Sequence, residues 1–419
     1  MWRKNNAHQA NAALPCKCMK VRTCIITFVI KSSLLTLCHP AAGQVWIQAT
    51  NFSANGVSLA SSADGSKVVA AFENLTGIYS SINGGQTWTW LSNSVQFGSF
   101  PAIACSADGN FVVAGNYTNN TIYTSTNGGV TWTSNNVASS KGWYSIASSA
   151  DGTRLVAAPN GPGPIFTSSD AGTTWRSNNV PNTSWYGVAC SADGGKVVAA
   201  DPLHMAVYAS TDFGTNWTMH STAPVSLLSV ASSADGMKLV AGAYGGPTFT
   251  STNAGTTWIA NDLPWVREYC VATSAEGDKL AAADQAPFGE TINGPIYTST
   301  NGGVTWVSNN VPPLGWSSIV SSADGRRLAA ASLTAIPGAV YVFQAPPAPK
   351  LNIASADHNV LVSWVLPSQP FTLQQTTDLT TSNWTAVTNT PVLNLTNLQE
   401  EVVVPISAGN AFYRLETSP

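Results

Sequence analysis

Small apolar and small polar residues alternate with tight-turn sequences in a ten-residue pattern that recurs through most of the chain. The seven copies are SSADGSKVVA (61–70), CSADGNFVVA (105–114), SSADGTRLVA (148–157), CSADGGKVVA (190–199), SSADGMKLVA (232–241), TSAEGDKLAA (273–282) and SSADGRRLAA (321–330). Their turn acids are Asp64, Asp108, Asp151, Asp193, Asp235, Glu276 and Asp324, with spacings of 44, 43, 42, 42, 41 and 48 residues. A period near 43 residues is typical of a β-propeller blade with four short strands.

A second pattern lies between the copies of the first and ends in tryptophan. Its six copies are SINGGQTW, STNGGVTW, SSDAGTTW, STDFGTNW, STNAGTTW and STNGGVTW, which end at Trp88, Trp132, Trp175, Trp217, Trp258 and Trp306. Within one repeat, the two patterns predict strands over 143–149, 154–158, 164–168 and 173–177. Asp151-Gly152 is predicted to form the tight hairpin between the first two strands, because Gly tolerates positive φ and Asp bonds nearby amides.

Seven copies of one pattern against six of the other indicate how the ring of blades closes. The last repeat ends after a predicted third strand at 339–343, and Val45-Trp46-Ile47 supplies the missing fourth strand. Trp46 precedes Asp64 by 18 residues, the same interval that separates Trp175 from Asp193. The sequence therefore predicts an all-β protein whose residues 44–345 form a seven-bladed β-propeller closed by the N-terminal strand.

The composition changes after residue 345. Residues 346–350 belong to a Pro-rich linker, and 351–419 contain strand-like segments at 360–364, 371–375 and 412–415. Such a pattern over about 70 residues is typical of a small β-sandwich.

The six segments that end in tryptophan resemble the Asp-box (BNR) repeat, S-x-D-x-G-x-T-W. Sialidases, sortilin, xyloglucanase-type glycoside hydrolases and the photosystem II assembly factor carry this repeat. Asp170 and Asp212 hold its Asp position, where the other copies have Asn83, Asn127, Asn253 and Asn301. The resemblance covers about residues 44–345 and implies the propeller fold. In these families the box is a structural turn, so it implies no activity.

Residues 1–43 are predicted to be a leader that contains a signal peptide, with Met19 as the expected start. Lys20 and Arg22 give a positive start, 24–38 is mainly apolar, and Ala41-Ala42-Gly43 provides small residues before the expected cleavage point. We therefore expect a secreted protein, located outside the cell, in the periplasm or at the cell surface, and not an integral membrane protein. Without the leader, 12 basic and 21 acidic residues leave a formal net charge of −9, which argues against nucleic acid as a partner.

The sequence offers little for catalysis. The sialidase arginine cluster is missing, and Arg154 and Arg327 occupy a repeat position that elsewhere holds lysine, so we expect them to be solvated strand residues. A glycoside hydrolase needs two carboxylates in one cleft. The candidates are Asp201, Glu268, Asp284 and Glu290, of which Asp284 and Glu290 lie in the longest loop. His204, beside Asp201, is interpreted as a surface histidine, and no Cys/His spacing predicts a metal site or cofactor.

Aromatic residues recur eight positions before the turn acids. They are Phe100, Trp143, Trp185 and Trp316. Two interpretations stay open: the rings bind a sugar or a peptide on the loop face, or they form a hydrophobic plug.

These patterns favour a monomeric, non-catalytic recognition or scaffold module that binds a polysaccharide or a protein on its loop face. The alternative is a glycoside hydrolase of the Asp-box propeller type.

Overall fold

The computed structural model describes most of the chain between residues 46 and 417. The described residues are 46–50, 57–72, 76–96, 102–116, 120–137, 139, 141–221, 225–264, 269–284, 294–332, 339–345, 351–356, 359–365, 371–377, 384–394, 399–405 and 411–417. The leader, with Met19, and the linker 346–350 lie outside them. All regular structure in this part is β-strand, so it contains no helix long and apolar enough to cross a membrane.

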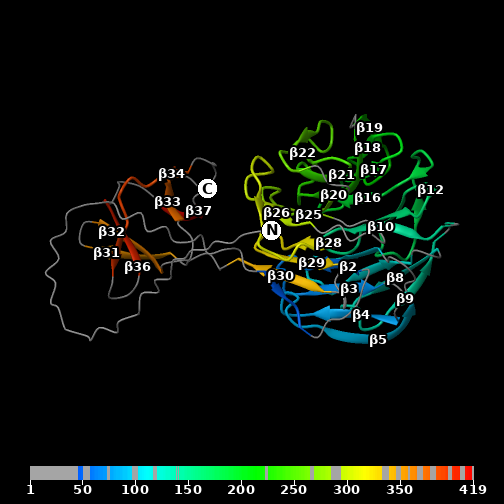
Figure 1. The fold of residues 1–419 in the computed structure, drawn as a ribbon, viewed down its shortest axis with the longest axis horizontal. Helices are drawn as coiled ribbons and strands as arrows, with labels where there is room; N and C mark the ends of the chain where they lie inside the picture. Colours follow the sequence, from blue (N-terminus) through cyan, green and yellow to red (C-terminus); the bar gives the residue numbers. More distant parts are fainter. Residues whose placement is uncertain are drawn as a thin grey trace, which may run out of the picture. The chain divides into compact units, whose positions relative to one another are not determined.

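Four-stranded antiparallel sheets follow one another along the first three quarters of the chain, from blue to yellow in Figure 1. The first holds β2 (Val57–Ser61), β3 (Val68–Phe72), β4 (Thr76–Ser81) and β5 (Thr89–Gln96). The second holds β6 (Ala102–Cys105), β7 (Val112–Gly115), β8 (Thr121–Ser125) and β9 (Thr133–Asn136). The third holds β10 (Trp143–Ser148), β11 (Leu155–Pro159), β13 (Phe166–Ser168) and β14 (Arg176–Ser177), and a short pair, β12 (Pro162–Gly163) and β15 (Thr183–Ser184), lies outside it.

The next three sheets repeat this order. They hold β16 (Gly187–Cys190), β17 (Val197–Asp201), β18 (Ala206–Ser210) and β19 (Thr218–Ser221); then β20 (Ser226–Ser232), β21 (Leu239–Tyr244), β22 (Thr248–Ser251) and β23 (Ile259–Ala260); then β24 (Tyr269–Thr273), β25 (Leu280–Asp284), β26 (Ile296–Ser299) and β27 (Val307–Ser308). The four strands predicted for residues 143–177 are therefore present, with ends within three residues of those expected.

One more four-stranded sheet contains strands from both ends of the repeat region. It holds β28 (Trp316–Ser321), β29 (Arg327–Ser332), β30 (Val340–Gln344) and, as its fourth strand, β1 (Trp46–Gln48). Trp46 pairs with Phe343 and Gln48 with Tyr341 in antiparallel register. The strand exchange expected from the unequal counts of the two patterns is present.

Six of the seven copies of the first pattern form the same hydrogen-bonded hairpin. In the first copy, Ser62 Oγ donates to Asp64 Oδ1 at 2.6 Å and accepts from the backbone N–H of Lys67 at 3.0 Å. Gly65 has a φ of +67°, which a residue with a side chain rarely adopts. The sixth copy, with Glu276, departs from this arrangement, because Ser274 Oγ donates to Asp278 Oδ1 instead.

The hairpins are joined to one another by a closed circle of backbone hydrogen bonds. The alanine before each turn acid donates its N–H to the carbonyl oxygen of the corresponding alanine in the next repeat, at 2.6–2.8 Å. The circle runs through Ala63, Ala107, Ala150, Ala192, Ala234, Ala275 and Ala323, and Ala323 donates back to Ala63. The repeats are therefore arranged around one axis, with the first strand of each sheet nearest to it.

Neighbouring hairpins also contact through a basic side chain and a glycine. A Cβ atom on Gly194 would lie 2.7 Å from Cβ of Arg154, which belongs to the preceding repeat. Arg154 donates from Nη1 to the carbonyl oxygen of Asp193 at 3.0 Å, and Arg327 makes the equivalent bond to Asp64 at 3.2 Å. These arginines are partly exposed, as expected, and their side chains also join adjacent repeats.

The core consists of separate apolar clusters between adjacent sheets. One cluster contains Ala60, Val69 and Ile78 of the first sheet with Ile103 and Val112 of the second. Small residues near the axis and larger ones further out fill a gap that widens outward. The tryptophans that end the second pattern pack at these clusters, and each donates its indole N–H to the carbonyl oxygen of the glycine three residues earlier, as Trp88 does to Gly85 at 2.8 Å.

The C-terminal residues form two further sheets. One has the order β31 (Asn352–Ala356), β32 (Asn359–Val365), β36 (Gln399–Pro405) and β35 (Val392–Asn394). The other has the order β34 (Thr385–Ala386), β33 (Phe371–Thr376) and β37 (Phe412–Thr417). Val362, Trp364, Leu373 and Val402 share a core between them.

Replacement of Trp46 by alanine tests the closing strand. The side chain is buried and its ring centroid lies 5.8 Å from that of Phe343, so Trp46→Ala should lower the free energy of unfolding by about 3–5 kcal/mol in urea denaturation. Ile47→Ala is the matched control, because Ile47 is the next residue of β1 and is exposed. Equal stability of the two variants would contradict the closure.

Candidate functional site

The strands of each four-stranded sheet end alternately at two opposite faces. The hairpins of the first pattern and the turns of the second pattern lie together at one end, as the bond from the Gly84 N–H to the Ser66 carbonyl oxygen shows. We call this end the turn face. The opposite end, where β17 finishes at Asp201 and β25 at Asp284, carries the connections to the next strands and is called the loop face.

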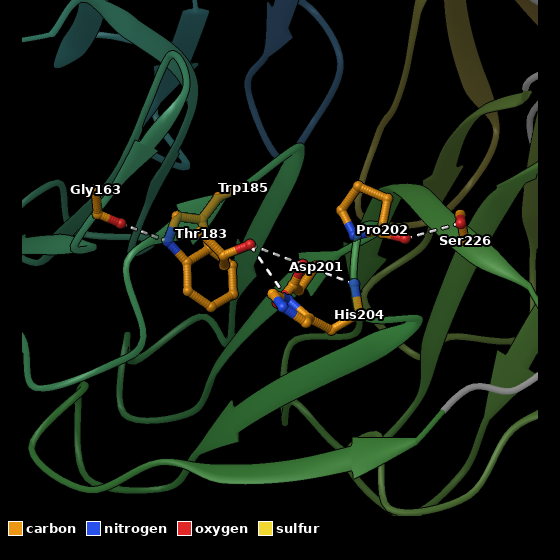
Figure 2. Close-up of polar contacts among 7 residues, drawn as sticks. All are labelled: Gly163, Thr183, Trp185, Asp201, Pro202, His204 and Ser226. Carbon is orange, nitrogen blue, oxygen red and sulfur yellow. Dashed lines mark hydrogen bonds and ion pairs between the residues drawn. The ribbon is translucent and has the colours of Figure 1, made fainter.

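A buried carboxylate at the loop face organises the connection between β17 and β18. Asp201 is 0% exposed. Its Oδ1 accepts from Thr183 Oγ1 at 3.0 Å and from the backbone N–H of His204 at 3.3 Å, while its Oδ2 lies 2.7 Å from His204 Nδ1. Figure 2 shows these contacts. Thr183 belongs to the short strand β15, so two separate segments converge on one carboxylate.

The carboxylate determines which way the histidine presents its ring nitrogens. A carboxylate only accepts hydrogen bonds, so the Nδ1 atom that faces Asp201 carries the proton. The His204 side chain is 63% exposed although its partner is fully buried. The second nitrogen, Nε2, is therefore the ring atom available to a ligand.

The loop around His204 displays two large apolar side chains. Leu203 is 65% exposed and Met205 is 44% exposed. Met205 has a φ of +51°, a backbone conformation that is unfavourable for a residue with a side chain. Ser226 of the next sheet donates from Oγ to the Pro202 carbonyl oxygen at 2.8 Å. Ser226 is also the strand partner of Tyr244, whose side chain is exposed. Residues 202–205 are thus held from both sides, and we call them the 202–205 loop.

Two of the four candidate acids, Asp201 and Asp284, lie among the described residues, and Glu268 and Glu290 lie outside them. Asp284 is 7% exposed, and burial raises its pKa from the usual range to about 6. Asp201 and Asp284 end strands of two sheets that the sheet β20–β23 separates. Each acid is therefore buried in its own environment.

The aromatic candidates lie in the interior. Trp143, Trp185 and Trp316 are all fully buried, and Phe100 lies outside the described residues. Trp185 and Trp316 donate their indole N–H groups to the carbonyl oxygens of Gly163 and Gly294, both at 2.9 Å. Trp143 packs edge-to-face on Phe166 at 5.5 Å. None of the three rings presents a face to solvent, so these tryptophans belong to the clusters between sheets.

Comparison with known proteins identifies the fold. No protein-family model matches the chain, and no curated protein matches its sequence. Among solved structures, YCF48 bound to D1 peptide is similar, with a TM-score of 0.54 and 17% identity over 72% of this chain and 97% of that one. YCF48 from Cyanidioschyzon merolae is also similar, with a TM-score of 0.53 and 14% identity over 71% of this chain and 98% of that one. The GH74 xyloglucanase from Xanthomonas campestris has a TM-score of 0.53 and 14% identity over 77% of this chain and 59% of that one.

The fold is that of a β-propeller. Two further aromatic residues lie at the start of innermost strands. Tyr144 and Tyr186 follow Trp143 and Trp185 by one residue, are half-buried, and have ring centroids 4.9 Å apart. Tyr144 lies at a register irregularity of β10 and Tyr186 lies just before β16, and neither ring is buried as deeply as the tryptophan beside it. Both tyrosines lie seven positions before their turn acids, whereas the tryptophans lie eight positions before them.

The propeller axis opens at the turn face into a cavity of about 200 Å³. Its walls are small side chains from every hairpin, and they include Cys105 and Cys190. These cysteines and Cys270 form no disulfide within the described residues. Burial raises the pKa of Cys105 and of Cys190 to about 12, so both thiols stay protonated.

No metal site is apparent in the described part of the propeller. A search there finds no group of three or more His, Cys, Asp or Glu side chains that could hold a metal ion.

Stability at low pH tests the structural role of the turn acids. The Ser62 hydroxyl, the Ser66 hydroxyl and the Ser66 backbone N–H lower the pKa of Asp64 to about 2. The stabilisation is complete above the unfolded-state pKa near 4 and is lost as the pH falls toward 2. Asp64→Asn should therefore flatten the fall in melting temperature between pH 4 and 2, while the exposed control Asp262→Asn should follow the wild type. A curve for Asp64→Asn parallel to that of the wild type would contradict this role.

Proposed function

We propose that the protein is a secreted or cell-surface recognition module that binds an extended protein segment on its loop face, without catalysis. It consists of a closed propeller of seven Asp-box blades followed by a small β-sandwich. The predicted signal peptide supports a location outside the cytoplasm.

The alanine circle supports seven blades. It passes once through each of the seven hairpins and returns to its start, and β1 supplies the fourth strand of the last sheet. The hydrogen bond from each Asp-box tryptophan to its own glycine is the same in every copy, as in Trp132 to Gly129 and Trp306 to Gly303, which supports the Asp-box assignment.

The observation that carries the proposal is the preorganised 202–205 loop. Burial of a carboxylate is unfavourable unless hydrogen bonds compensate for its lost hydration. Asp201 accepts three such bonds, and two of them hold the backbone and the ring of His204. A loop fixed in advance loses little conformational entropy when it binds, which favours affinity.

The side chains of this surface suit a protein segment. Leu203, Met205 and Tyr244 are exposed and apolar or aromatic, and His204 adds one directed nitrogen. Methionine adapts to varied apolar partners, and a backbone or side-chain group of an extended peptide can bond to the imidazole. YCF48, which has a similar fold, has been solved with a bound D1 peptide.

The carboxylates support a non-catalytic role. Asp201 is fully enclosed and engaged with Thr183 and His204, so it is not available to donate or abstract a proton on a substrate. A glycoside hydrolase requires an acid carboxyl group and a second carboxylate that both face the same cleft.

Selection of ligands on the purified mature chain tests the surface. We expect peptides selected from a random display library to bind at least tenfold more weakly to the double variant Leu203→Ala/Met205→Ala, because the variant loses the exposed apolar contacts. The matched control is Ile82→Ala/Val304→Ala, which removes two exposed apolar side chains from Asp-box turns on the turn face. Titration calorimetry gives the dissociation constants. Selected peptides that bind equally to both double variants would refute the loop-face proposal.

A glycoside hydrolase is the second candidate, and Asp284 is the observation in its favour. A carboxyl group with a pKa of about 6 is suited to act as a general acid near neutral pH. The similar fold of a GH74 xyloglucanase is consistent with this alternative.

Incubation with xyloglucan and other soluble polysaccharides distinguishes the two candidates. The recognition proposal predicts no release of reducing sugar above the enzyme-free blank. Release that disappears in Asp284→Asn, with the exposed Asp262→Asn as control, would establish the hydrolase instead.

A further inference from the structure

The C-terminal module contains one Lys or Arg among residues 351–419. This residue is Arg414, and five Asp or Glu residues accompany it, so the formal net charge of the segment is −4. Arg414 lies on β37, in the sheet that β33, β34 and β37 form side by side (Figure 1). The position of Arg414 in this sheet decides which surface of the module carries the cation.

Strand register places Arg414 on the face of the sheet that is turned away from the core. Leu373 pairs with Leu415, and both contribute to the apolar core of the module. Gln374 pairs with Arg414 on one side and with Ala386 on the other. Because successive residues of a strand point to opposite faces, the row of Ala386, Gln374 and Arg414 lies on the outer face. Exposure agrees with this placement, because Ala386 and Arg414 are both exposed.

Trp384, which directly precedes β34, contacts this row and orients the arginine. The guanidinium carbon of Arg414 lies 4.5 Å from the centroid of the Trp384 ring, and Arg414 Nε donates to Gln374 Oε1 at 2.9 Å. Arg414 is exposed while Trp384 and Gln374 are half-buried, so the guanidinium lies toward the solvent side of the group. An indole, a guanidinium and a carboxamide thus form one array of planar groups, which we call the Trp384–Arg414–Gln374 platform.

The platform combines a stacking surface with hydrogen-bonding groups. Indole and guanidinium planes both accept flat ligands against their faces, and the guanidinium and the carboxamide carry several N–H donors in fixed planes. A sugar ring matches this combination, because its C–H bonds form an apolar face and its hydroxyls hydrogen-bond around the rim. Arg414 is already held by the indole and by Gln374, so little of its side-chain entropy remains to be lost on binding.

The charge of the module narrows the class of glycan. A formal net charge of −4 repels a polyanion, whereas an uncharged polysaccharide meets no such repulsion. The other sheet of the module offers a different surface, since Val392 and Val403 are 67% and 49% exposed and have no hydrogen-bonding side-chain groups. The chemistry that suits an uncharged sugar is therefore that of the platform.

We propose that the Trp384–Arg414–Gln374 platform binds an uncharged polysaccharide, with a sugar ring stacked on the Arg414–Trp384 pair and its hydroxyls bonded to Arg414 and Gln374. The site lies in a different module from the 202–205 loop and does not depend on peptide recognition there. The C-terminal module then attaches the chain to a glycan.

Affinity electrophoresis of the full mature chain tests the platform. Native gels contain xyloglucan, galactomannan or laminarin as uncharged probes, or polygalacturonate as a polyanion, and each mobility is compared with that in a gel without polysaccharide. At least one uncharged probe should retard the chain, and Trp384→Ala should weaken that binding by about tenfold through the lost stacking surface. Trp90→Ala is the matched control, because it removes a 53% exposed tryptophan from β5 of the propeller and should leave the retardation unchanged.

A second variant keeps the test decisive if Trp384→Ala does not fold, which its melting temperature reports. Arg414→Leu changes an exposed position and removes the planar donors, so it should also weaken the retardation. No retardation by any of the three uncharged probes, retardation by polygalacturonate alone, or equal retardation of Arg414→Leu and the wild type would overturn the proposal. Leu203→Ala/Met205→Ala should leave the retardation unchanged, which separates glycan binding at the platform from peptide binding at the loop face.

Discussion

The circle of hydrogen bonds between the hairpin alanines is the constraint on which the propeller depends. Each alanine must offer its N–H and its carbonyl oxygen to the two neighbouring repeats at once, which requires every hairpin to have the same shape. The Ser–Asp pair fixes that shape locally, as Ser62 and Asp64 do in the first copy. The glycine after the acid permits both the positive φ and the contact with the basic stem of the preceding repeat, as Gly194 does with Arg154. A uniform turn therefore becomes a ring, and β1 completes its last sheet.

A rigid turn face leaves the loop face open to variation. The residue eight positions after the turn acid differs in most repeats, and it is an aspartate in only two of the seven copies. In the Asp201 copy the carboxylate holds His204 and fixes the 202–205 loop in an exposed arrangement with an unfavourable φ at Met205. Backbone strain of this kind persists only where surrounding contacts impose it, and here those contacts come from Asp201 and Ser226. The scaffold thus holds the 202–205 loop in one conformation.

The two aspartates show how the same residue acquires opposite properties from its partners. Asp201 is satisfied by an internal imidazole and a hydroxyl, whereas Asp284 is surrounded by apolar groups and a glycine. The pKa of Asp284 rises because burial removes hydration and no described donor replaces it. The same repeat position therefore holds a hydrogen-bonded carboxylate in one repeat and a carboxyl group with a raised pKa in the other.

The sequence by itself determined the strand pattern, the hairpins and the pairing of Trp46 with the last repeat, because these follow from local turn chemistry repeated at a constant period. It also located Asp201, Asp284 and His204 as loop-face residues. Only the tertiary structure decided that Trp143, Trp185 and Trp316 are fully buried while Tyr144 and Tyr186 are half-buried, because burial depends on which neighbouring sheet packs over each residue. The contact of Thr183 with Asp201 and His204 likewise joins segments 18 and 21 residues apart, and no local pattern encodes the distance between them.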